Sequence, residues 1–152
     1  MTRLVFITGA SSGIGQALAA RFHRSGHRLA LVARRSDEVE RWAAAQGLDP
    51  ASWKVYRADV RDVAAITAVG RECIAAQGLP DVVIANAGIS VGVDTAERAD
   101  LDVVQETVAV NLVGLAATFH PFVAPMHARG AGGDDAVDVG HVGGVDRAAL
   151  AR

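Results

Sequence analysis

The residues best suited to chemistry form a glycine turn over positions 9–15, near the start of the chain. An apolar run at 4–7 precedes the turn, and apolar residues at helical spacing follow it, so the stretch predicts a strand, a turn and a helix. Free N–H groups and the positive end of the helix dipole would then favour a bound pyrophosphate. We expect that group to contact the turn residues Gly9, Ser11, Ser12, Gly13, Ile14 and Gly15.

Each glycine of this turn has a mechanical reason. Gly9 can leave the strand in a backbone shape that a Cβ disfavours, Gly13 lets a ligand approach, and Gly15 lets the helix press on the strand. The spacing G-x-x-x-G-x-G departs from the general dinucleotide fingerprint G-x-G-x-x-G, and a turn that binds nothing is the alternative. The run Thr-Gly-x-x-x-Gly-Ile-Gly at 8–15 resembles the short-chain dehydrogenase/reductase family over its N-terminal portion, up to about residue 133.

Arg34 and Arg35 directly follow the second predicted strand, over residues 28–33. In dinucleotide-binding folds an acidic residue here binds the free 2′-hydroxyl of the adenosine ribose. Two arginines instead offer planar donor forks to a 2′-phosphate. We therefore expect NADP(H) to be favoured over NAD(H); a solvated basic lead-in to the next helix is the alternative.

Two further strand ends match the family's cofactor site. The pair at 59–60 matches the position that contacts the adenine ring, although a plain turn aspartate would look the same. The run A-N-A-G at 85–88 resembles the family's Asn-Asn-Ala-Gly, with only the first asparagine replaced. The resemblance thus adds to the cofactor site Asp59, Val60, Asn86, Ala87 and Gly88.

Asn111 lies on the apolar stripe of a long predicted helix that begins near residue 100. A buried amide needs hydrogen-bond partners, so a structural role that kinks the helix is one interpretation. The resemblance implies another, the asparagine that positions a water beside the catalytic lysine. We expect Pro121 and Pro125 to kink or end this helix. Its expected inward side chains are Val104, Val108, Leu112, Leu115 and Phe119.

The order of elements indicates an α/β fold. Four apolar strands, at 4–7, 28–33, 53–56 and 81–85, alternate with helical segments, which predicts a doubly wound parallel sheet of Rossmann type. We expect the sheet order 3-2-1-4, in a truncated domain over residues 1–129. Residues 130–152 are rich in glycine and aspartate and read as a poorly ordered tail; a shifted reading frame or natural divergence would both produce them.

The family's catalytic residues have no match in the sequence. The resemblance implies hydride transfer between a nicotinamide and a small carbonyl or alcohol, with a serine, a tyrosine and a lysine acting on the substrate oxygen. The one tyrosine and one lysine are Tyr56 and Lys54, on an early strand, and no serine follows Ser90. We therefore expect the chain as written to be inactive. The alternatives are a non-catalytic dinucleotide-binding module and a sheet that binds an adenosine methyl donor.

The composition of the chain bears on its partners, its compartment and the presence of a metal site. A net charge of −2 over 152 residues suggests neither a nucleic-acid nor a membrane partner. A single cysteine fits a reducing compartment, so we expect the cytoplasm. The resemblance implies a homo-oligomer. We expect no metal site, because no acid or cysteine completes a ligand set with His120, His127 and His141.

Overall fold

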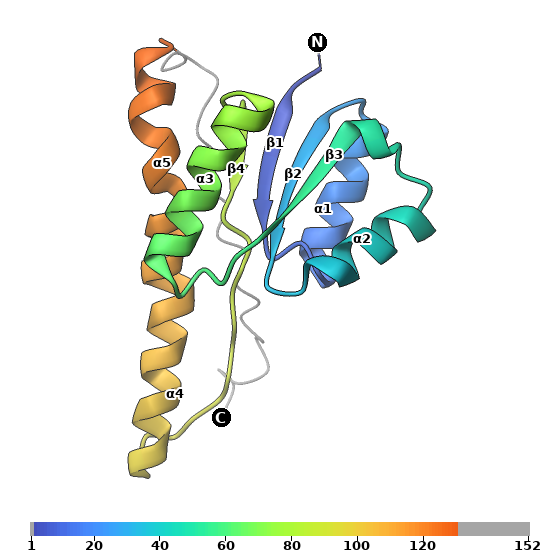
Figure 1. Cartoon of the computed structure of the whole chain (residues 1–152). Coiled ribbons are helices and arrows are strands. Elements are labelled where there is room, and N and C mark those ends of the chain that lie inside the picture. The colour runs from blue at the N-terminus through green and yellow to red at the C-terminus, as the bar shows by residue number, and fades with distance from the viewer. Residues whose placement is uncertain (1, 131–152) are drawn as a thin grey trace.

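A computed structural model describes residues 2–130 (Figure 1). Its four strands form one parallel sheet in the order β3-β2-β1-β4, which confirms the predicted topology. The predicted tail lies outside the described residues apart from Gly130. The strands are β1 (Leu4–Thr8), β2 (Arg28–Ala33), β3 (Trp53–Arg57) and β4 (Val82–Ile84).

Helices cover both faces of the sheet, as Figure 1 shows. Between the strands lie α1 (Gly13–Arg24), α2 (Ser36–Ala45), the short 3₁₀ helix η1 (Pro50–Ser52) and α3 (Val63–Gln77). After β4 come α4 (Arg98–Val108), the π-helical turn η2 (Ala109–Gly114) and α5 (Leu115–Ala128).

The side chains of β1 alternate between two hydrophobic cores. Val5 and Ile7 join the core beneath α1 and α2, whereas Leu4 and Phe6 join the core beneath α3 and α5. The ring of Phe6 meets that of Phe122 on α5 edge-on, with centroids 4.8 Å apart. Every residue of β1 is buried, as expected for a central parallel strand with helices on both faces.

Asp81 fixes the start of β4 beside β1. Its carboxylate Oδ2 accepts a hydrogen bond from the Leu4 N–H at 2.8 Å, and its own N–H donates to the Leu4 carbonyl at 2.8 Å. This exchange sets the register Val5 opposite Val82 that the pairing continues. The carboxyl ends of β1 and β4 are thereby brought level at one edge of the sheet.

The long helical stretch after β4 differs from the prediction on two points. Val104, Val108 and Leu112 are exposed rather than inward, whereas Phe119 is buried. Pro121 and Pro125 lie inside α5, so they do not end the helix, and the predicted alternative, a kink, stays a prediction. Within the described part of the chain, Arg98–Ala128 is also the one helical stretch long and apolar enough to cross a membrane by length and composition.

Pro121 lies where α5 packs closely on α3. Proline lacks the N–H that would bond to the preceding turn, and its ring crowds that turn. Here the ring is buried against Gly70 of α3, where an added Cβ would lie 2.3 Å from the Pro121 Cγ. Gly70 therefore lets α3 approach this turn of α5 closely, a contact between distant residues that sequence signals for helix ends do not register.

Candidate functional site

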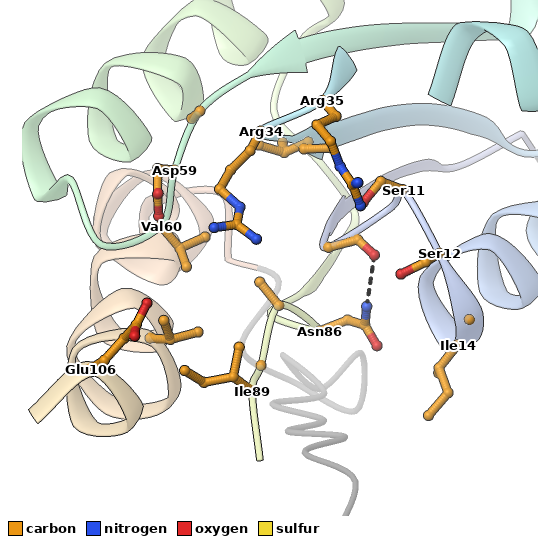
Figure 2. Close-up of a pocket in the computed structure, with 18 residues that line it drawn as sticks. Ser11, Ser12, Ile14, Arg34, Arg35, Asp59, Val60, Asn86, Ile89 and Glu106 are labelled. Atoms are coloured by element: carbon orange, nitrogen blue, oxygen red, sulfur yellow. Dashed lines mark hydrogen bonds between the residues drawn. The ribbon is translucent and has the colours of Figure 1, made fainter. Parts of the chain in front are cut away.

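A cavity of about 480 Å³ lies at the carboxyl edge of the sheet (Figure 2). This is where open parallel sheets bind ligands, beside the point at which the strand order reverses. The predicted cofactor residues all line it except Gly15, which lies behind the turn. They are Gly9, Ser11, Ser12, Gly13, Ile14, Arg34, Arg35, Asp59, Val60, Asn86, Ala87 and Gly88.

The three glycines of the turn differ in what a side chain would meet. Gly9 has φ +68° and Gly13 has φ +53°, both in the left-handed region. A Cβ on Gly15 would lie 2.1 Å from the Gly9 carbonyl oxygen, so Gly15 is where α1 presses on the end of β1. A Cβ on Gly13 would meet nothing within 4 Å, because Gly13 faces open space at the cavity. Their expected mechanical roles are consistent with this geometry.

The N-terminus of α1 is left free to hold an anion. Ser12 is the N-cap residue, but its side chain makes no capping hydrogen bond, and the first turn contains no acidic residue. The last turn contains Arg21, His23 and Arg24, on the side that suits the negative end of the dipole. No carboxylate of the first turn of α1 therefore compensates the N–H groups that face the cavity.

Asn86 holds the turn against the end of β4. Its amide Nδ2 donates to the Thr8 carbonyl at 3.1 Å and to the Gly9 carbonyl at 3.2 Å; the latter bond is drawn in Figure 2. The Ala87 N–H donates to the Thr8 hydroxyl at 3.2 Å. Asn86 therefore braces the end of β1 against the segment that follows β4.

The two arginines after β2 are in different electrostatic situations. Arg35 pairs with Glu38 of α2 at 3.1 Å. Arg34 forms no ion pair or hydrogen bond with any residue between 2 and 130, and Figure 2 shows its guanidinium extending into the cavity. Arg34 is thus the cation that is free to bind an anionic group there.

Asp59 lies at the end of β3, in a cluster of charges at the cavity. Its carboxylate accepts from the Arg61 Nε at 3.0 Å and from the Arg61 Nη2 at 2.6 Å. Arg61 Nη1 donates in addition to Glu106 Oε1 on α4, at 2.7 Å. The hydrogen bonds from Arg61 lower the pKa of the Asp59 carboxyl, and the nearby charge of Arg34 adds to the effect.

Asn111 occupies the π-helical turn η2 and bonds to a single residue. Its Oδ1 accepts from the Ile89 N–H at 2.9 Å, and its Nδ2 donates to the Ile89 carbonyl at 2.7 Å. The side chain thus anchors the segment after β4, in agreement with the structural interpretation. A part in positioning a catalytic water stays a prediction.

The chain's tyrosine and lysine lie away from the cavity. The Tyr56 hydroxyl is buried beneath α3 and donates to Gln77 Oε1 at 3.0 Å, and burial raises the pKa of Tyr56 well above its ordinary value. Lys54 pairs with Glu72 at 3.3 Å. Burial likewise raises the pKa of the nearby Cys73 thiol to about 11. These groups serve the packing of β3 and α3.

Sequence patterns missed some residues of the cavity. The most consequential is Glu106, an exposed helical glutamate in no motif, which reaches the site only because α4 passes beside the end of β3. Val32, Ala33 and Ala58 could have been inferred, since each precedes a predicted site residue. Within residues 2–130, no three side chains of the metal-ligating types cluster. The missed lining residues are Val32, Ala33, Ala58, Ile89, Glu106 and Val110.

Comparisons with known proteins agree with this geometry. The family model described as short chain dehydrogenase matches residues 3–148. The "Dehydrogenase/reductase SDR family protein 7-like" of Drosophila melanogaster is 37% identical over 134 residues, which cover 86% of this chain and 41% of that protein.

Solved structures give the same result. A short-chain dehydrogenase from Streptomyces avermitilis superposes with a TM-score of 0.76 at 27% identity, covering 86% of this chain and 46% of that one. An alcohol dehydrogenase from Thermococcus sibiricus, complexed with 5-hydroxy-NADP, gives 0.72 at 29% identity, covering 86% and 55%. The chain spans about half the length of such relatives. Its glycine turn, its sheet order and these matches together show that the chain belongs to the short-chain dehydrogenase family.

Proposed function

We propose that the chain forms the NADP(H)-binding part of a short-chain oxidoreductase. The observation that carries the proposal is the cavity itself, which combines the uncompensated N-terminus of α1 with the unpaired guanidinium of Arg34. A dinucleotide with a 2′-phosphate has two anionic groups, and these are the two places suited to receive them. The family implies a nicotinamide cofactor without deciding between NADP and NAD.

The residues present fit such a cofactor. The open space at Gly13 suits the pyrophosphate, and Arg34 suits the 2′-phosphate. Asp59 offers a carboxylate to the amino group of adenine, and the strand end at 86–88 suits the nicotinamide side. When bound, the nicotinamide supplies hydride chemistry. The chain's own part is to bind and orient the cofactor at the sheet edge.

We further propose that the whole protein acts on a small carbonyl or alcohol substrate. Within residues 2–130, neither the tyrosine nor the lysine lines the cavity, so neither is placed there as the proton donor that such a reaction needs. Tyr56 bonds to Gln77 and Lys54 to Glu72, both away from the cavity. These observations favour, as a second candidate, a module that binds the dinucleotide without turning it over. A homo-oligomer, a cytoplasmic location and the absence of nucleic-acid or membrane partners stay predictions.

The cofactor preference can be tested by calorimetric titration with NADPH and NADH. We expect the unmutated chain to bind NADPH about ten- to a hundredfold more tightly, since a charge-assisted hydrogen bond contributes about 1.5–3 kcal/mol. Arg34→Ala should remove most of this difference, whereas Arg41→Ala should leave it unchanged, because Arg41 pairs with Asp37 on the surface of α2. Equal affinities in the unmutated chain would overturn the preference.

The pyrophosphate position can be tested by Gly13→Val. The added side chain meets no protein atom within 4 Å at its Cβ, so far-UV circular dichroism should change little. The left-handed φ adds a strain of about 1–2 kcal/mol. Titration with NADPH should show no binding, because the branched side chain occupies the approach to the helix N-terminus. Normal NADPH binding by this variant would show that the turn is only structural.

A further inference from the structure

Arg61 belongs to no motif and does not itself line the cavity, yet it joins two carboxylates that do. It lies in the turn between β3 and α3, two residues after Asp59. Its backbone N–H and its Nε donate to Asp59 Oδ1 at 3.0 and 3.1 Å, while its Nε and Nη2 donate to Oδ2 at 3.0 and 2.6 Å. These hydrogen bonds from Arg61 therefore fix the orientation of the Asp59 carboxylate.

The other side of the guanidinium is held by α4. Glu106 Oε1 accepts from Arg61 Nη1 at 2.7 Å, across 45 positions of the chain. No residue of α4 is buried. The ion pair between Glu106 and Arg61 connects α4 to the β3 side of the cavity. Glu106 and Asp59 thus orient Arg61 from opposite sides, and each carboxylate is neutralised in part by it.

This arrangement determines what Asp59 can recognise. A carboxylate with both oxygens bound to Arg61 stays ionised and offers its remaining lone pairs as acceptors only. At the cavity such a group attracts an N–H donor and repels a carbonyl oxygen. Adenine has an exocyclic amino group on carbon 6 of the purine ring, whereas hypoxanthine has a carbonyl on the same carbon.

We propose that Arg61 is a positioning residue for nucleotide recognition: held by Glu106, it presents the Asp59 carboxylate to the amino group of the adenine ring. The inference rests on the proposed binding of NADP(H). It adds a residue outside the glycine turn and the arginine pair, and it gives α4 a part in the nucleotide site.

The test compares NADPH with its hypoxanthine counterpart, in which a carbonyl replaces the amino group. Calorimetric titration should show that the unmutated chain binds NADPH about tenfold more tightly than the hypoxanthine nucleotide, because one hydrogen bond to a charged group changes affinity by about this factor. Arg61→Ala should reduce this ratio to within about twofold by weakening NADPH alone. Glu106→Gln should reduce the ratio in part. Arg98→Ala is the matched control, since Arg98 pairs with Asp102 within α4.

The ratio separates positioning from general damage, because a loss of fold weakens both nucleotides equally. If Arg61→Ala does not fold, Arg61→Lys, which keeps the charge but not the fork, carries the same expectation of a reduced ratio. An unchanged ratio in a folded Arg61 variant would overturn the inference while leaving NADPH binding intact. An unmutated chain that binds neither nucleotide would instead overturn the proposed function, and this inference with it.

Discussion

The two ends of the long helical stretch Arg98–Ala128 both carry apolar side chains, but their surroundings are opposite. The first half, α4, buries none of its residues, whereas α5 buries six, among them Phe119, Phe122 and Met126. The difference lies in the partner: α3 packs along α5, and in Figure 1 α4 extends past the end of α3. Helical periodicity identifies an apolar face but does not say what lies against it.

We expect the largest effect from a substitution in the covered half, Phe122→Ala. The Phe122 ring is 1% exposed and meets Phe6 of the central strand edge-on. Its removal should lower the free energy of unfolding by about 3–5 kcal/mol, measured by urea denaturation. The matched control is Val123→Ala on the exposed side of α5, which should change little. A loss below about 1 kcal/mol for Phe122→Ala would contradict the packing of α5 on the sheet.

A smaller effect should come from the ion cluster that ties α4 to the end of β3. Because Arg61 lowers the pKa of Asp59 in the folded chain, the ionised carboxylate stabilises the fold above the unfolded pKa, near 4. That stability is lost as the pH falls through the lower, folded pKa. The difference in unfolding free energy between the chain and Asp59→Asn should therefore be constant above about pH 5 and shrink below pH 4. If this difference in unfolding free energy instead grew as the pH falls, the pKa of Asp59 would be raised in the folded chain, and the prediction would be wrong.

The smallest effect should come from the exposed side of η2, the turn that follows α4. Leu112 is 64% exposed, so Leu112→Ser should change the free energy of unfolding by no more than about 0.5 kcal/mol. Urea denaturation at low protein concentration measures this directly. A loss of 2 kcal/mol or more, on the scale of about 2–5 kcal/mol for a buried leucine, would show that the outer face at η2 is covered in solution.

Local structure could be predicted from the sequence at positions where a contact with the backbone restricts the residue type. Gly15 must lack a Cβ because the Gly9 carbonyl is so close, and Asp62 caps α3 by accepting from the Ala65 N–H at 2.9 Å. Such constraints are local, so the strand–turn–helix order and the strand ends of the site could be predicted. The fixed hand of each crossover limits the possible sheet orders, and the doubly wound fold that the glycine turn indicates gives 3-2-1-4.

The parts that could not be predicted depend on distant partners. Pro121 of α5 packs closely on Gly70 of α3, and Glu106 at the cavity pairs with Arg61. Neither pairing has a spacing rule, since the partners meet only when α3 and α4 are in place. The outward face at Val108 and Leu112 was missed for the same reason.

The bonds from Asn86 to the glycine turn also set an order of events in folding. The residues that these bonds join are separated by 78 and 77 positions in the sequence, and β1 pairs with β4 over a similar separation. A chain synthesised from its N-terminus can pair β1 with β2 early, but closing so long a loop is slow. Until residue 86 has emerged, the carbonyls of Thr8 and Gly9 lack this partner and the turn lacks its brace. A nucleotide can therefore act on the nascent chain only late, by trapping a sheet in which β1 and β4 have already paired.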